Sequence, residues 1–263
     1  MDYNYHTHTY RCHHASGTIE EYVKRAIEGG IKYMGFSDHL PLICSDGTEV
    51  FYRVSVSEVD DYVSEISEIR EKYKDMIDLK IGFEMEYYPD FFENMLKNAI
   101  KWGGEYLILG EHFIEEENPD IKLKSVRSKQ NTPEKFIKYA DCVIDAMKSG
   151  VFSYIAHPDI FYFDENDKIY DEQMRRICKA SNELDVPLEI NFLGIREGRE
   201  YPKEKFWQIA GEEKSPVTFG FDAHDVLNAF DDKSLVKAKE MVRKFNLNYI
   251  GKPQIIDIRK VVL

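Results

Sequence analysis

Cysteine is scarce in this chain of 263 residues. The four cysteines are scattered, and no two of them form a CxxC pair. This usage predicts free thiols and argues against a disulfide framework or a cysteine-rich zinc site. Only Cys12 lies in a histidine-rich segment, so a role near a functional site is a hypothesis for this residue.

Long hydrophobic runs are also missing. No stretch approaches the roughly 20 apolar residues that a membrane-spanning helix requires. The first residues carry neither the basic nor the apolar region of a signal peptide. We therefore expect a cytoplasmic protein with no membrane partner. Hydrophobic residues still make up 43% of the chain and aromatic residues 13%, enough to bury a large core.

Positive charge is in deficit, with 35 Lys and Arg residues against 48 Asp and Glu residues and a net charge of −13. An acidic surface without a basic stripe repels nucleic acids and anionic lipids, so we expect no nucleic acid partner. An anionic small substrate would need local cations to hold it, which points towards metal ions. The sequence gives no indication of the oligomeric state.

Short β-rich segments alternate with longer amphipathic segments, and no repeat or Pro/Gly-rich linker separates them. This alternation predicts βαβ units with a parallel sheet. Seven such units suit one α/β domain over residues 1–263, folded as a TIM-like barrel, better than an open doubly wound sheet, which remains the alternative. The predicted strands are Tyr3–His8, Tyr33–Ser37, Leu79–Glu84, Tyr106–Gly110, Tyr154–Ala156, Pro187–Asn191 and Val217–Gly220.

The histidines follow the predicted strands, and none of them lies in a predicted helix. Side chains at the carboxyl ends of parallel strands converge on one face of a barrel, where active sites form. Histidines with only surface or core roles would also occur on the helices, so this distribution favours a shared site. The eight are His6, His8, His13, His14, His39, His112, His157 and His224.

The pair His6 and His8 fits metal binding on a strand, because residues i and i+2 project to the same side. Glu84 follows the third predicted strand, and Asp222 follows the seventh. Imidazole and carboxylate ligands together suit zinc, iron or manganese, and a carboxylate can bridge two ions.

Six ordered motifs resemble the PHP (polymerase and histidinol phosphatase) family, of the histidinol-phosphatase type, along nearly the whole chain. The resemblance implies a distorted (β/α)7 barrel with a metal site at the C-terminal ends of its strands. It also implies hydrolysis of a small phosphate monoester, above all L-histidinol phosphate to L-histidinol and phosphate in histidine biosynthesis. The motifs are His6-Thr7-His8 with His14, Phe36-Ser37-Asp38-His39, Gly82-Phe83-Glu84, Gly110-Glu111-His112, Ala156-His157-Pro158-Asp159 and Phe221-Asp222-Ala223-His224.

The resemblance further implies three divalent metal ions and assigns their ligands. The first ion would take His6, His8, Glu84 and Asp222; the second would share Glu84 and add His112 and His157; the third would take His14, His39 and His224. His13 is left over.

Three further residues have implied or expected roles. The resemblance implies that Arg196, after the sixth predicted strand, binds the substrate phosphate, and a guanidinium suits this role because it fits phosphate oxygens bidentately. Arg199 is a second candidate in the same loop. Asp38, beside His39, is expected to orient a ligand rather than shuttle a proton.

Alternatives stay open at this stage. The substrate could be another phosphomonoester, such as a nucleotide, a sugar phosphate or phosphotyrosine. A metal-dependent amidohydrolase also begins with HxH, but no lysine here ends a predicted strand. A metal-binding module without turnover is the third alternative.

Two local features bear on these alternatives. The segment Ile160–Phe163 lacks the basic residue that histidinol phosphatases often carry there, so the identity of the alcohol that leaves the phosphate stays undetermined. The polar segment 119–130 is expected to be a mobile loop rather than a lid.

Overall fold

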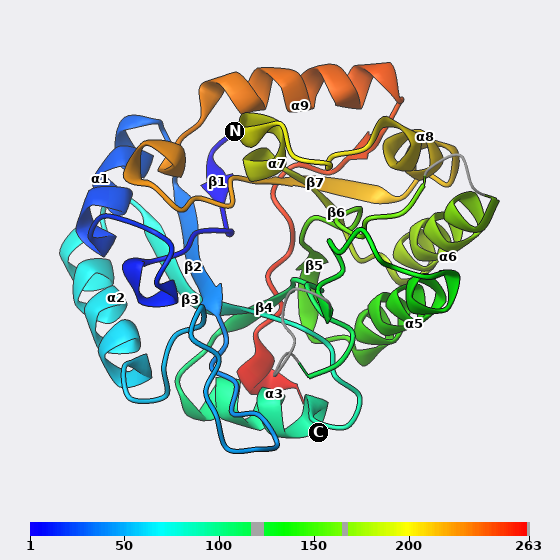
Figure 1. Cartoon of the computed structure of the whole chain (residues 1–263). Helices are drawn as coiled ribbons and strands as arrows, with labels where there is room; N and C mark the ends of the chain where they lie inside the picture. The colour runs from blue at the N-terminus through cyan, green and yellow to red at the C-terminus, as the bar shows by residue number, and fades with distance from the viewer. Residues whose placement is uncertain (117–123, 165–167, 262–263) are drawn as a thin grey trace.

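The computed structural model describes residues 1–116, 124–164 and 168–261. Their strands form one parallel sheet in which each strand pairs with the next along the chain. Figure 1 shows this sheet curling on itself, with the helices packed around its outside. The TIM-like α/β fold is therefore confirmed. The strands are β1 (Tyr3–Asn4), β2 (Tyr33–His39), β3 (Asp78–Met85), β4 (Tyr106–Leu109), β5 (Phe152–Ile155), β6 (Leu188–Asn191), β7 (Pro216–Gly220) and β8 (Asn248–Tyr249).

The segment after β1 joins the two sides of the curled sheet. Thr7 forms an isolated parallel bridge with Ala223, and its carbonyl accepts a 2.8 Å hydrogen bond from the Ser37 amide in β2. The predicted first strand is thus regular only at Tyr3–Asn4. The eighth strand, which the sequence did not predict, is a two-residue pairing beside β7 that carries no apolar run.

The helices lie between successive strands and bury one face against the sheet. A capping box formed by Thr18 and Glu21 starts the first helix. None of the described helices is long and apolar enough to span a bilayer. They are α1 (Ile19–Glu28), α2 (Val59–Tyr73), α3 (Phe92–Lys101), α5 (Pro133–Ser149), α6 (Lys168–Leu184), α7 (Phe192–Glu197), α8 (Glu204–Glu212) and α9 (Asp232–Lys244), with short 3₁₀ turns at Tyr10–Cys12, Val226–Ala229 and Ile258–Lys260.

Tyrosines fill the interior of the sheet beneath the histidine-rich end. The Tyr106 hydroxyl donates a 2.8 Å hydrogen bond to the Tyr5 carbonyl. A Cβ at Gly35 or Gly82 would collide with the Tyr106 ring, so glycine on two neighbouring strands makes room for it. This packed floor holds the strand ends above it in place. Its members are Tyr3, Tyr5, Tyr106, Ile108, Tyr154 and Ala156.

Candidate metal centre

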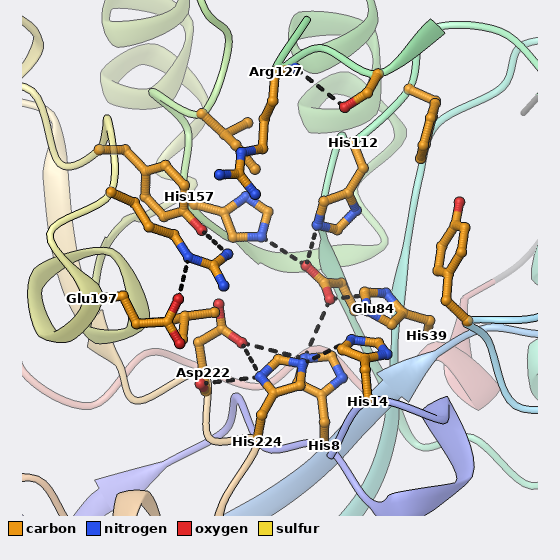
Figure 2. A pocket seen from close by; sticks show the side chains of 17 residues that line it. His8, His14, His39, Glu84, His112, Arg127, His157, Glu197, Asp222 and His224 are labelled. Atoms are coloured by element: carbon orange, nitrogen blue, oxygen red, sulfur yellow. Dashed lines mark hydrogen bonds and ion pairs between the residues drawn. The ribbon is translucent and has the colours of Figure 1, made fainter. Parts of the chain in front are cut away.

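The nine predicted metal ligands all lie at the carboxyl ends of the strands, around a pocket of about 500 Å³ (Figure 2). All of them line this pocket except His6, which is fully buried beside it. Most sit on a strand end or one to three residues beyond it, which is why segments far apart in sequence meet here. They are His6, His8, His14, His39, Glu84, His112, His157, Asp222 and His224.

Glu84 of β3 stands at the middle of the imidazoles. Its Oε1 lies 2.9 Å from His157 Nε2 and 3.6 Å from His112 Nε2. Its Oε2 lies 3.2 Å from His39 Nδ1, and His6 and His8 are within 4 Å of the same oxygen. Burial opposes ionisation, but His112, His39 and His6 outweigh it and hold the pKa of this carboxyl well below its usual range. The carboxylate can therefore be shared between cations on its two sides.

Asp222, after β7, approaches the opposite side of the first histidine pair. Its Oδ1 lies 3.5 Å from Nε2 of both His6 and His8 and 3.2 Å from His224 Nδ1. Its backbone has a φ of 46°, in the left-handed region that non-glycine residues rarely adopt. A strained residue with its carboxylate aimed into a cluster of imidazoles is typical of a functional site.

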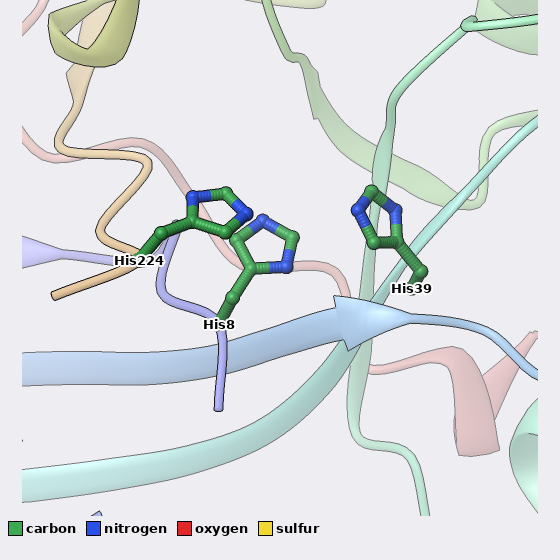
Figure 3. Close-up of side chains that lie close together, drawn as sticks. All are labelled: His8, His39 and His224. Carbon is green, nitrogen blue, oxygen red and sulfur yellow. The ribbon is translucent and has the colours of Figure 1, made fainter. Parts of the chain in front are cut away.

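The remaining imidazoles gather beside His8. The rings of His8 and His224 stack with centroids 4.1 Å apart, and His39 lies 4.7 Å from His8 on the other side (Figure 3). The Nε2 atoms of His14 and His224 face each other at 3.1 Å. Tetrahedral zinc, with bonds of about 2.0–2.1 Å to nitrogen, separates two ligand nitrogens by a similar distance.

Donor atoms left without partners test whether this site fits metal ions. Within residues 1–116, 124–164 and 168–261, no hydrogen bond reaches the buried atoms His6 Nε2, His39 Nδ1 and Asp222 Oδ1, or either ring nitrogen of His8. Buried polar atoms are normally satisfied, and these converge within reach of one another. Several sets of ligand atoms lie within 4.8 Å of one another, among them His8, His39 and His224; His6, His8 and Asp222; and His6, Glu84 and His157. The residues therefore fit divalent cations.

A ring of carboxylates stands behind the imidazoles, and the sequence did not identify most of it. Glu189 of β6 lies 2.8 Å from His6 Nδ1, and Glu86 lies 2.9 Å from His112 Nδ1. Asp38 Oδ1 lies 3.4 Å from His8 Nδ1, so it stands behind His8 rather than His39. Carboxylates in this position fix the tautomer and orientation of a ligating histidine. The spacing of Glu86, two residues after Glu84 and just beyond the end of β3, was an available signal.

Arg196 is not brought into the pocket, contrary to the prediction that it contacts the substrate phosphate. Its guanidinium donates to Asp231 Oδ2 at 3.1 Å and to the carbonyls of Phe221 and Asp222 at 3.1 and 2.8 Å. It thereby braces the backbone of the strained Asp222 against Asp231, the residue that caps the start of α9. Arg199 does line the pocket, as does Arg127, which the sequence did not suggest.

The other sequence hypotheses have mixed outcomes. His13 is exposed, with its Nε2 4.0 Å from Glu58, and does not line the pocket. Cys12 is buried, and its sulfur lies within 4.8 Å of ligand atoms of His14 and His224. Part of the predicted loop 119–130 lies outside the described residues. Its described part contributes Ser125 and Arg127 to the pocket wall.

Comparisons with known proteins agree with this geometry. The chain is 26% identical over 236 residues to "Probable histidinol-phosphatase" of Deinococcus radiodurans, covering 83% of this chain and 85% of that protein. It is 25% identical over 247 residues to the histidinol-phosphatase of Bacillus subtilis, covering 83% and 92%.

A solved structure shares the fold. It is the histidinol phosphate phosphatase of Lactococcus lactis complexed with zinc, L-histidinol and phosphate, which aligns with a TM-score of 0.72 at 19% identity over 100% of this chain and 99% of that chain. The family model described as the PHP domain matches residues 4–192, well over half of the sequence. The chain therefore belongs to the PHP domain family.

Proposed function

We propose that this chain is a metal-dependent phosphomonoesterase that hydrolyses L-histidinol phosphate to L-histidinol and phosphate. The observation that carries the proposal is the set of buried, unpartnered imidazole and carboxylate atoms around Glu84 at the bottom of an open pocket. The names of the curated relatives and the molecules bound by the Lactococcus lactis enzyme support this choice of substrate.

Three divalent ions, of zinc, iron or manganese, are proposed to occupy the site. The first would be held by His6, His8, Glu84 and Asp222. The second would share Glu84 and add His112 and His157, and the third would be held by His14, His39 and His224. Divalent cations in such sites activate water as a nucleophile and neutralise charge on phosphoryl oxygens.

The side chains behind the ligands fix the geometry of the reaction. Glu189 holds the ring of His6 through its Nδ1 atom, and Asp38 Oδ1 stands 3.4 Å behind the Nδ1 atom of His8, so that each Nε2 is directed at the cluster. Asp38 is itself held by the Thr9 amide, which donates to both of its oxygens at 3.0 and 3.1 Å. Arg196 keeps Asp222 in its strained conformation. This preorganisation removes the cost of arranging ligands during the reaction.

The pocket walls suit a small aromatic amine. Tyr52, Phe113, Ile160 and Tyr201 offer flat or apolar surfaces on which an imidazole ring would stack. Glu197 adds a carboxylate to the same walls; its Oε2 accepts from Arg199 Nε, and its Oε1 can still accept from an ammonium group. The acidic surface of the protein would repel a nucleic acid, so a small monoester fits best.

Phosphate release from a panel of monoesters tests the proposal. L-histidinol phosphate, a nucleoside monophosphate, a sugar phosphate and phosphotyrosine are each incubated with metal-loaded protein, with chelated protein and with a Glu84→Ala variant. We expect the highest kcat/KM for L-histidinol phosphate and no release in the two controls. Stoichiometric metal binding with no release from any monoester would instead indicate a binding module, and a faster substrate elsewhere in the panel would replace histidinol phosphate.

A further inference from the structure

Arg127 is held over the pocket by a short strap, residues 124–131. The Val126 amide donates to the carbonyl of His112 at 2.9 Å. The Val126 carbonyl accepts from the Tyr162 amide at 2.8 Å and from Asn131 Nδ2 at 2.6 Å. Both backbone groups of Val126 are therefore fixed, one of them to a proposed metal ligand. The next residue along the strap starts from a defined place above the cluster.

The guanidinium of Arg127 lacks the partners that the neighbouring arginines have. Arg196 is bound to Asp231 and two carbonyls, and Arg199 Nε donates to Glu197 Oε2 at 2.7 Å while its Nη1 donates to the Tyr201 hydroxyl at 3.0 Å. In the part of the chain that the structure describes, no carboxylate pairs with Arg127. Figure 2 shows its side chain reaching from the strap towards His157, into the pocket.

Apolar side chains and the proposed metal ligands line the same pocket as this guanidinium. Ile160 and Phe113 line the same pocket and offer it no hydrogen-bond acceptor on their side chains. The proposed metal ligands lie beneath it. Burial raises the pKa of the Tyr201 phenol, and the positive charges of Arg199 and Arg127 lower it in part. An unpaired guanidinium in such a place gains most from an anion that enters the pocket.

We propose that Arg127 is a substrate-binding residue that binds the phosphoryl group of the monoester from the side opposite the metal cluster. Arg199 lies on the adjoining wall of the pocket. The proposal rests on the proposed phosphatase function. Two of the guanidinium N–H groups can donate in parallel to two phosphoryl oxygens, a geometry that a lysine cannot reproduce. In a chain with a net charge of −13, this cation would supply local attraction for a dianion that the overall field repels.

Inorganic phosphate and L-histidinol separate this role from a structural one. Calorimetry on metal-loaded protein would measure the Kd of each ligand for the wild type, Arg127→Gln and Arg127→Lys. Lys129→Gln is the matched control, because it removes the same charge from the same strap without lining the pocket. We expect Arg127→Gln to weaken phosphate binding by about 10- to 100-fold, as befits a lost charged hydrogen-bond pair. Arg127→Lys should be intermediate, and Lys129→Gln should stay within about twofold.

Binding of L-histidinol, which has no phosphate, should change by less than about twofold in Arg127→Gln, while KM for the phosphorylated substrate rises in parallel with the phosphate Kd. Equal weakening of both ligands would mean that the strap merely collapsed and would overturn the inference. Unchanged phosphate affinity in Arg127→Gln, with turnover intact in the wild type, would also overturn it while leaving the phosphatase function standing. A wild type that releases no phosphate but binds it through Arg127 would overturn the function alone.

Discussion

Replacing Glu189 with glutamine is the sharpest perturbation of the site that leaves every proposed ligand in place. Glu189 and His6 are both fully buried, and their Oε1 and Nδ1 atoms lie 2.8 Å apart. The other oxygen, Oε2, accepts from the His157 amide at 3.1 Å and from Asn191 Nδ2 at 2.9 Å. The carboxylate thus faces three nitrogens, and it can accept from all of them.

A glutamine of the same shape cannot satisfy this arrangement. If its NH₂ group faces His6, then Nδ1 must accept, the ring proton moves to Nε2, and that nitrogen can no longer bind a cation. If the amide turns over, its NH₂ group meets two donors instead, the His157 amide and the Asn191 side chain. Either orientation weakens the site through His6 or His157.

Both orientations of the glutamine lead to the same expected loss of metal affinity. Loss of a carboxylate behind a ligating histidine costs about 10- to 100-fold in metal affinity, equivalent to about 1.4–2.7 kcal/mol. Competition for zinc against a chromophoric chelator would measure it, with kcat recorded under saturating metal. Glu105→Gln is the matched control: Glu105 is also largely buried, but it pairs with Arg70 and Arg259 away from the pocket. Wild-type metal affinity in Glu189→Gln would refute the reasoning.

Three further outcomes are expected from the same geometry. Burial lowers the pKa of His6, but the carboxylates of Glu189, Asp222 and Glu84 outweigh it and raise that pKa to about 10 in the metal-free protein. The ring is therefore cationic at about pH 7.5 and must lose its proton to bind metal, so metal affinity should rise with pH. Calorimetry in buffers of different ionisation enthalpy would detect the released protons, and their absence would contradict this prediction. Removing the metal should lower the unfolding temperature by on the order of 10 °C, because an ion at a thousandfold excess over its Kd stabilises the folded protein by about 4 kcal/mol. Differential scanning calorimetry with and without chelator measures this shift, and no shift would argue against tight binding. Arg196→Gln should lower kcat by roughly tenfold while the Kd of phosphate stays within about twofold, because Arg196 braces Asp222 and does not face the pocket; a large loss of phosphate affinity would restore the role first predicted for it.

The place of the candidate metal centre could be predicted from the sequence because most of the proposed ligands are local to a strand end. His39 and Glu84 lie within regular strands, and His157 and Asp222 follow theirs by two residues. Once the alternation of strands and helices indicates a parallel barrel, these positions must share one rim. No long-range information about strand order is needed for that step.

The residues that the sequence did not reveal depend on orientation instead of position. Arg196 lies in the last turn of α7, and Arg199 follows the left-handed C-cap residue Gly198. Arg196 donates to Asp231 at the start of α9, whereas Arg199 lines the pocket. A six-residue helix is too short for its pattern to show this turn in advance. Arg127 lies in a polar segment without periodicity, and it is brought over the site by the hydrogen bonds that its neighbour Val126 makes to His112 and Tyr162.

Anomalous diffraction from crystals of the metal-loaded protein tests the central claim most directly. The account predicts several strong peaks within bonding distance of the imidazole and carboxylate atoms around Glu84, among them one touching His6, His8 and Asp222 and one touching His14 and His224. Crystals grown with excess zinc or manganese that show no peak among these side chains would contradict it.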